Sequence, residues 1–253
     1  MVYDLTFINH PAILRQTEGR AHIRADEITA LRGLRLFDKI AEATFADLVA
    51  AGYLQFFPPG VTLIRERDPA DFLHVVIEGT VELYAGGGER ETTMELIRPV
   101  GAFILAAVLS DRIYLQSART LTRARILMIP AERVRRGMAQ DAAFMTAIVA
   151  ELARGYRQAI KALKNQKLRT GAERLANWLI ASAAGQGTPG SVTLDVEKRV
   201  LASRLGMTPE NLSRAFSSLG AYGVLTRGAQ IELTDPAALE AFAHPDPLID
   251  ALE

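Results

Sequence analysis

The sequence predicts an α+β protein with an N-terminal antiparallel β roll, a long helix and a C-terminal winged helix-turn-helix, in that order. Three observations lead to this prediction. Between residues 60 and 130, short runs rich in Val, Ile, Leu, Phe and Tyr alternate with Gly and Pro turn signals, as in antiparallel sheets. Helical spacing then continues to about residue 167. After residue 196, two short helical segments precede two short strands.

Length and composition exclude several classes of protein. The chain has 253 residues, 49% of them hydrophobic, and can bury a substantial core. It contains no Cys, which excludes disulfides, thiolate nucleophiles and iron–sulfur clusters. No apolar run of about 18 residues and no secretory signal is present, so we expect no membrane partner and a cytoplasmic location. With 29 Lys and Arg against 29 Asp and Glu, bulk charge does not indicate a polyanion partner.

We expect four regions along the chain. Residues 1–25 form an N-terminal extension. Residues 26–130 form the sensor domain, in which helical segments up to Gly52 come before the strands of the β roll. Residues 131–169 form the long helix, broken at most once near Gln140. Residues 170–253 form the winged helix-turn-helix domain, with a hinge expected over 167–171.

Apolar residues recur along the long helix at steps of three and four, as at a seam between two copies of a helix. This stripe predicts a homodimer interface of Met145, Ile148, Leu152, Tyr156, Ala159 and Leu163. The alternative is a helix packed against its own β roll.

The segment TPENLSRAFSSL, residues 208–219, predicts the second helix of the helix-turn-helix. Thr208 is placed to cap it and Pro209 suits the first helical position. Its apolar face contrasts with a compact polar face of small hydroxyls, one Glu and one Arg. That face is either a reading surface for DNA or an ordinary solvated helix face. The strands VLTR and QIEL would form the wing.

Three segments carry a resemblance to a known family: LFDKIAEATFADL, DFLHVVIEGTVELY and LASRLGMTPENLSRAFSSL. With the order of its domains, the chain resembles the CRP/FNR family of bacterial transcription regulators from about Leu34 to Phe242. The resemblance implies a homodimer that binds double-stranded DNA at an inverted repeat and has RNA polymerase as a partner. The Glu-x-x-Ser-Arg motif of the FNR-like branch implies TTGA-type half-sites. The expected DNA-binding residues are Thr208, Glu210, Asn211, Ser213, Arg214 and Ser217.

The resemblance also locates an effector pocket. Family members that bind cyclic AMP carry a Glu after Phe-x-Gly and, ten residues on, Arg-Ser-Ala. Here Ala106 and Gln116 replace the Glu and the Arg, which argues against cyclic AMP because a buried phosphate needs a charged partner. Arg112 and Arg119 remain as substitute partners. The expected pocket consists of Phe103, Leu105, Ala106, Tyr114, Gln116 and Ser117, in a run that is equally typical of core.

Haem, with nitric oxide or another gas, is a candidate effector, as in the family's carbon monoxide sensors. The candidate axial ligands are His10, His22 and His74. The alternative is a regulator that responds to a cyclic nucleotide or another small ligand in a non-standard pocket.

We expect no enzyme activity, because the sequence shows no catalytic constellation. A cupin-like metal enzyme would need clustered His ligands, and His74 is the one His within the predicted roll. A module that binds only protein partners would leave the helix-turn-helix unexplained.

Overall fold

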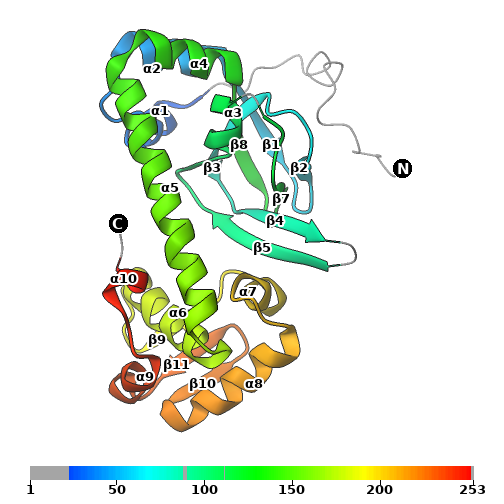
Figure 1. The fold of residues 1–253 in the computed structure, drawn as a ribbon, viewed down its shortest axis with the longest axis vertical. Helices are drawn as coiled ribbons and strands as arrows, with labels where there is room; N and C mark the ends of the chain where they lie inside the picture. Colours follow the sequence, from blue (N-terminus) through cyan, green and yellow to red (C-terminus); the bar gives the residue numbers. More distant parts are fainter. Residues whose placement is uncertain (1–22, 88–89, 111, 252–253) are drawn as a thin grey trace. The chain divides into compact units, whose positions relative to one another are not determined.

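The computed structural model describes residues 23–87, 90–110 and 112–251 (Figure 1). Its contacts divide the chain into two compact units, Met1–Ala153 and Arg154–Glu253. Antiparallel sheets in the first unit, a long helix and a helix-turn-helix in the second confirm the predicted α+β class.

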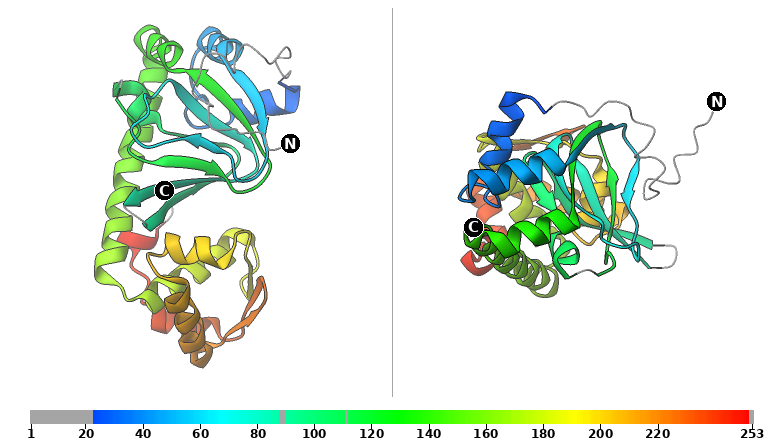
Figure 2. Two further views of the ribbon diagram at one scale, coloured as in Figure 1. Left: turned by 90° about the vertical axis from the view of Figure 1, so that its right-hand side faces the viewer. Right: turned by 90° about the horizontal axis from the view of Figure 1, so that it is seen from above.

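The described part of the N-terminal unit contains two antiparallel four-stranded sheets. Their strands are β1 Tyr53–Phe57, β2 Thr62–Ile64, β3 Phe72–Glu78, β4 Val81–Gly87, β5 Arg90–Ile97, β6 Gly101–Phe103, β7 Ser117–Thr120 and β8 Ala124–Pro130. One sheet has the order β1-β8-β3-β6 and the other the order β2-β7-β4-β5. Neighbours in sequence such as β3 and β4 lie in different sheets, so the chain crosses repeatedly between them and forms a roll (Figure 2).

The β3–β4 turn requires glycine. Gly79 has a φ of +86°, and a Cβ on it would lie 2.3 Å from the carbonyl oxygen of Arg123. Both the backbone conformation and the close approach therefore exclude other residues without local rearrangement.

The helices that begin in this unit are α1 Ala25–Arg32, α2 Glu42–Ala51, α3 Leu105–Ser110, α4 Ala131–Gln140 and α5 Ala142–Leu168. In Figures 1 and 2, α1, α2 and α4 gather at one end of the roll. Gly52 caps α2, at the end of the helical segments expected from the sequence. None of the described helices, α5 included, combines the length and apolar character of a membrane span.

The predicted break in the long helix lies at Asp141, between α4 and α5. Asp141 has an extended backbone, with φ −125° and ψ 106°. Its carboxylate accepts hydrogen bonds from the N–H groups of Ala143 at 2.9 Å and Phe144 at 3.2 Å, which begin α5. The same carboxylate accepts from the N–H of Ala41, at the start of α2, at 2.8 Å. One side chain thus caps α5 and attaches it to α2.

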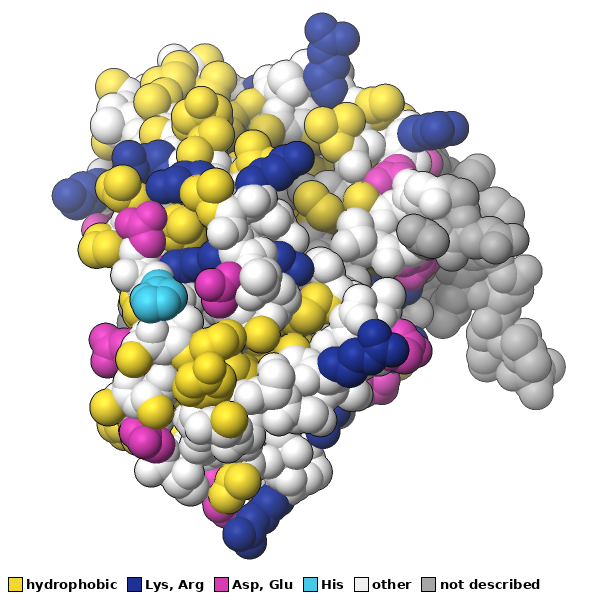
Figure 3. Space-filling model, turned by 60° about the horizontal axis from the view of Figure 1, so that its bottom comes forward, with side chains coloured by type: hydrophobic (Ala, Val, Ile, Leu, Met, Phe, Trp, Pro, Cys, Tyr) yellow, Lys and Arg dark blue, Asp and Glu magenta, His cyan; other side chains and the backbone are white. Residues whose placement is uncertain are grey.

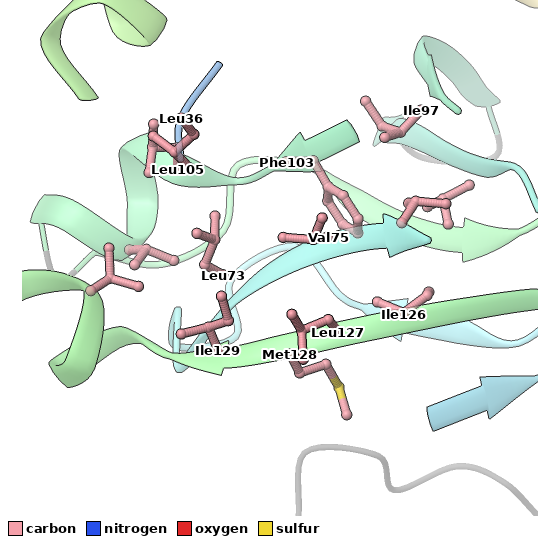
Figure 4. Close-up of a cluster of buried hydrophobic side chains, with 14 of the residues drawn as sticks. Leu36, Leu73, Val75, Ile97, Phe103, Leu105, Ile126, Leu127, Met128 and Ile129 are labelled. Atoms are coloured by element: carbon pink, nitrogen blue, oxygen red, sulfur yellow. The ribbon is translucent and has the colours of Figure 1, made fainter. Parts of the chain in front are cut away.

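The core of this unit lies along β3 and β8, the two central strands of their sheet. Leu73, Val75, Leu127 and Ile129 are fully buried. Figure 4 shows side chains of β3, β8, β6 and α3 packed in one cluster. Strands buried on both faces appear in the sequence as continuous apolar runs, which explains why the segment 72–77 does not alternate clearly.

A buried ion pair attaches α1 to the roll. The carboxylate of Glu27, 3% exposed, accepts hydrogen bonds from Arg125 of β8 and from Arg24, the latter at 2.8 Å. Burial opposes ionisation of Glu27, but the N–H and guanidinium donors of Arg24 and the charge of Arg125 lower its pKa overall.

The C-terminal unit is built from helices around a small sheet. Its elements after α5 are α6 Gly171–Gln186, β9 Ser191–Thr193, α7 Lys198–Arg204, α8 Pro209–Leu219, the 3-10 helix η1 Gly220–Tyr222, β10 Val224–Arg227, β11 Gln230–Leu233, α9 Pro236–Ala243 and α10 Pro247–Asp250. The sheet has the order β10-β11-β9 and is antiparallel. Leu179, Leu219, Ile231 and Leu239, all fully buried, join its helices and strands in one core.

Candidate nucleic-acid interface and effector pocket

Helix α8 begins as the sequence predicts. Thr208 has an extended backbone, and its hydroxyl accepts a hydrogen bond from the N–H of Asn211 at 3.2 Å. Pro209 occupies the first helical position. Gly206, with φ +65°, makes the turn after α7. A tight turn followed by a capped helix fixes the direction of α8 relative to α7.

The two faces of α8 differ as predicted. The buried face packs into the core of the C-terminal unit through Leu212, Ala215, Phe216 and Leu219. All the predicted DNA-binding residues are exposed: Thr208, Glu210, Asn211, Ser213, Arg214 and Ser217. The structure therefore brings these six residues together on one accessible helix.

The two charged residues of this face, Glu210 and Arg214, lie near the start of α8. Hydrogen bonds from the Glu210 backbone and the Thr208 hydroxyl, with the nearby charge of Arg214, lower the pKa of Glu210. Glu210 is thus an ionised acceptor one turn before the guanidinium donors of Arg214. Figure 3 brings the lower end of Figure 1 forward and shows Lys and Arg side chains interspersed with hydrophobic and uncharged ones. Among the six predicted DNA-binding residues, Glu210 and Arg214 are the two that carry a charge.

The wing follows α8 in the chain. Strands β10 and β11 pair with Arg227 opposite Gln230, and Gly228 has a φ of +66° in the turn between them. Arg227 forms a 3.2 Å ion pair with Glu232, and Leu225 is 44% exposed. The third strand of this sheet, β9, is absent from the sequence prediction because three residues give too short a pattern.

Sequence reasoning also misses Arg174, which holds the turn of the helix-turn-helix. Its Nε donates to the carbonyl of Leu205 at 2.8 Å and its Nη1 to the carbonyl of Arg169 at 2.7 Å. Arg174 is 9% exposed, and this burial lowers the pKa of its guanidinium. The available signal is an Arg directly before the buried pair Leu175 and Ala176 in α6.

The predicted effector pocket is largely core in this structure. Phe103, Leu105 and Tyr114 are buried, while Ala106 is exposed on α3. Leu105 occupies the Gly position of Phe-x-Gly and packs into the core of the roll. Burial raises the pKa of the Tyr114 phenol to about 12. The apolar run therefore contributes to packing, which is the alternative that the sequence leaves open.

The polar residues of the predicted pocket lie at the start of β7. The hydroxyl of Ser117, a buried residue, accepts a hydrogen bond from the N–H of Glu66 at 3.0 Å. The side-chain oxygen of Gln116 is buried without a hydrogen-bond partner. An unpaired buried acceptor is costly, and a donor group would satisfy it.

Arg119 is already engaged and does not replace the missing phosphate partner. Its Nε donates to Glu82 at 2.7 Å and its Nη1 to Glu91 at 2.8 Å. Its guanidinium also lies 4.2 Å from the centre of the Tyr84 ring. Two carboxylates beside it make this an unfavourable place for an anion.

His74 is buried in β3. Its ring stacks on Phe103, with centroids 5.1 Å apart, and lies edge-on to Phe72 at 6.4 Å. Its Nδ1 has no hydrogen-bond partner, and burial lowers its pKa to about 4. A neutral imidazole suits metal ligation, but at 4% exposure it offers no face to a haem. Haem therefore does not fit at this residue.

The remaining His candidates are His10 and His22. His10 and His22 lie outside the residues that the structure describes. Over residues 23–87, 90–110 and 112–251, no three His, Asp or Glu side chains meet as a metal site.

The structure corrects the predicted stripe on α5 at one position. Ile148 is 1% exposed and belongs to the core of the N-terminal unit, so it is unavailable to a second copy. Val149, 57% exposed, takes its place. The exposed stripe comprises Met145, Val149, Leu152, Tyr156, Ala159 and Leu163. Its steps of four and three are those of a heptad seam.

Comparison with known proteins agrees with this architecture. The family model of the cyclic nucleotide-binding domain matches residues 54–141, and that of the Crp-like helix-turn-helix domain matches residues 173–242. A CRP-like cAMP-activated global transcriptional regulator from Mycobacterium tuberculosis is 24% identical over 220 residues, which cover 85% of this chain and 97% of the relative.

Two solved structures are similar over most of the chain. One is a Silicibacter pomeroyi DSS-3 protein provisionally described as a cAMP-binding regulatory protein. It is 28% identical with a TM-score of 0.58, covering 88% of this chain and 100% of that chain. FixK2 from Bradyrhizobium japonicum is 20% identical with a TM-score of 0.66, covering 80% of this chain and 98% of that chain.

The β roll, the long helix and the winged helix-turn-helix follow one another in the order of the two matched domains. Together with the similar regulators, this order shows that the chain belongs to the CRP/FNR family of transcription regulators.

Proposed function

We propose that this regulator is a homodimer that reads an inverted repeat with TTGA-type half-sites, under the control of an effector bound in the β roll. The observation that carries the proposal is the exposed face of α8, where Glu210, Ser213 and Arg214 stand on a capped helix. All three residues are exposed, so their side chains are accessible to base edges.

The residue types on this face suit direct reading of bases. The Arg214 guanidinium can donate two hydrogen bonds to the N7 and O6 atoms of guanine. The ionised Glu210 carboxylate can accept from the amino group of cytosine, and Ser213 can bond a base edge. Thr208 and the backbone N–H groups at the start of α8 are suited to a phosphate.

The stripe on α5 supports the homodimer. Tyr156 is 70% exposed and Leu163 54%, a large apolar surface along one line of a helix. A second copy would cover this surface as in a coiled coil. Its two-fold symmetry would present two α8 helices to half-sites about 34 Å apart. RNA polymerase is the expected partner of the bound dimer.

An uncharged effector suits the roll better than a cyclic nucleotide. Gln116 stands where a phosphate would need an Arg, and its unpaired oxygen would accept from an N–H or O–H group. Arg119 is held by Glu82 and Glu91. Activation by cAMP is a property of the Mycobacterium tuberculosis relative, and the residues of this pocket do not support its transfer.

The reading helix is tested by two substitutions of Arg214. We expect Arg214→Ala to weaken binding to the inverted repeat by about 1–3 kcal/mol per half-site, because it removes the bonds to guanine. Binding is measured by fluorescence anisotropy on the repeat and on DNA with the guanine replaced. Arg214→Lys is the matched control, since it keeps the charge but not the two-donor geometry.

If Arg214 reads a base, both variants lose preference for guanine, and Arg214→Lys keeps more of its affinity for unrelated DNA. If Arg214→Ala binds the repeat as tightly as the wild type, α8 is not the reading helix.

A further inference from the structure

The chain continues beyond the part matched by the helix-turn-helix model, which ends at residue 242. We call residues 244–251 the C-terminal strap. It contains α10, capped by Asp246, whose carboxylate accepts from the N–H of Leu248 at 2.8 Å. The N–H of Asp246 in turn donates to the Asp250 carboxylate at 2.7 Å. These bonds give the strap a defined internal structure.

The strap is attached to Arg169, the first residue of the α5–α6 junction. Asp250 accepts two parallel hydrogen bonds from Arg169, from Nη1 at 2.7 Å and from Nη2 at 2.5 Å. The side chains are 7% exposed for Arg169 and 27% for Asp250. Burial opposes ionisation of Asp250, but the bonds from Arg169 and Asp246 lower its pKa overall. A bidentate ion pair that is largely shielded from water is stronger and more directional than an ion pair on the surface.

Two further contacts tie the strap to the body of α5. The Nζ of Lys161 donates to the carbonyl of Ala251 at 2.8 Å. The Nζ of Lys164 forms an ion pair with Oδ2 of Asp246 at 3.8 Å. With Arg169, these residues bind the strap along the nine residues from Lys161 to Arg169, at the end of the long helix.

The same junction is bonded to the turn of the helix-turn-helix. Arg169 offers its carbonyl to Arg174, which also binds the Leu205 carbonyl. On the other side, Gln166 of α5 lies so close to Gly206 that a Cβ there would be 2.6 Å from its Oε1. A chain of contacts thus runs from Asp250 through Arg169 and Arg174 to the turn that precedes α8.

We propose that the C-terminal strap fixes the α5–α6 junction, with Asp250 as its positioning residue, so that α5 from Lys161 onward and the reading helix move as one body. The sequence predicts a hinge over 167–171. In the structure, Arg169 in this segment is bonded both to Asp250 of the strap and to Arg174 of α6. The contacts also place Arg154–Leu168 in the C-terminal unit. Any bending must then occur before Lys161.

The strap has a specific consequence for DNA recognition, which rests on the proposed homodimer. A stiff junction holds the two reading helices at one separation, so the dimer distinguishes inverted repeats by the spacing of their half-sites. A loosened junction leaves each α8 intact and lets the pair reach other spacings. The strap therefore determines spacing selectivity rather than affinity for one half-site.

The test compares Asp250→Asn with Asp235→Asn in the full chain. Asp235 caps α9 by accepting from the N–H of Ala238 at 2.9 Å, and it takes no part in the strap. Asn keeps the side-chain volume at both positions and can still cap α9 at position 235, so the variants differ in whether the pair with Arg169 is weakened. Binding is measured on the repeat with its cognate spacer, on repeats two base pairs longer or shorter, and on a single half-site.

We expect Asp250→Asn to reduce the preference for the cognate spacer about tenfold, which corresponds to about 1.4 kcal/mol, without changing single half-site affinity. Amide hydrogen exchange over residues 161–168 should rise in the same variant and stay unchanged in Asp235→Asn. Wild-type spacer preference or wild-type exchange in Asp250→Asn would overturn the proposal. If the wild type itself binds no inverted repeat, the proposed function fails instead, and exchange still decides whether the strap fixes the junction.

Discussion

The burial of His74 makes the free energy of unfolding depend on pH. Its imidazole stacks on Phe103 in the core of the roll and its pKa is lowered to about 4. In the unfolded chain an imidazole has a pKa of about 6.5. The unfolded state therefore binds more protons between these values, and His74 favours folding only while it is neutral.

We expect the wild type to lose about 3 kcal/mol of unfolding free energy through His74 as the pH falls from 6.5 to 4. His74→Phe fills the same space without a titrating group and should lack this part of the loss. Urea unfolding of both proteins at a series of pH values measures the difference.

His244 provides the control. It is exposed with a φ of 45° at the end of α9, where Asn is tolerated. His244→Asn removes an exposed imidazole and leaves His74 in place, so this variant should keep the part of the loss that His74 causes. Parallel curves for wild type and His74→Phe would show that His74 is not buried as a neutral group.

The role of a single residue can be predicted from the sequence when it depends only on neighbours in the chain. Thr208 and Pro209 are identified by their positions at a helix start, and the structure confirms both. Arg119 was not predictable, because Glu82 and Glu91 reach it from strands 37 and 28 residues away. The sequence shows that a phosphate partner is missing at Gln116, whereas only the fold shows that Arg119 does not replace it.

Among the elements, α5 illustrates what periodicity can and cannot decide. The break at Asp141 follows from the interruption of the pattern and is confirmed. The choice of Ile148 for the exposed stripe was wrong, because Ile148 and Val149 are adjacent apolar residues and only one of them faces the roll. Which of the two is buried depends on the rotation of α5 against the rest of the N-terminal unit, and no local pattern records that.

We expect Leu152→Glu to dissociate the proposed dimer, because it places a charge in the apolar stripe, where it would be buried without a partner. Gln158→Glu adds the same charge on the opposite face of α5, where the residue is exposed, and should leave the mass unchanged. Sedimentation velocity over a range of concentrations distinguishes monomer from dimer.

Equal masses for Leu152→Glu and the wild type would remove this stripe from the interface. Circular dichroism of both variants checks that α5 remains helical, since Glu and Leu have similar helix propensities.

At the scale of the whole molecule, the proposed effector and the operator would change each other's binding affinity equally. A ligand changes operator affinity only as far as it prefers one state of the protein, and the operator then changes ligand affinity by the same factor. The order of the domains was predictable from the sequence because each has its own period. The ligand was not, because an apolar run such as 103–109 serves equally as core or as a pocket.

Cyclic AMP should leave operator affinity unchanged, because Gln116 provides no charge for its phosphate and Leu105 fills the Gly position of the motif. Anisotropy titrations of the operator with and without cyclic AMP measure this, with 5′-AMP at equal concentration as the control for ionic strength. A cyclic AMP-specific gain in affinity would mean that the roll binds the nucleotide through other residues.

Asp141 sets the direction in which the exposed apolar stripe of α5 faces. Its carboxylate joins the first N–H groups of α5 to Ala41, so the helix starts at a fixed point on the roll. Each residue turns an α-helix by about 100°. One residue inserted between Ile148 and Val149 would leave the buried part of α5 in place and turn Leu152, Tyr156 and Leu163 by more than a quarter of a circle. The nine residues from Asp141 to Val149 thus set the rotational position of the exposed stripe about the helix axis, and with it the side from which a second copy would approach in the proposed dimer.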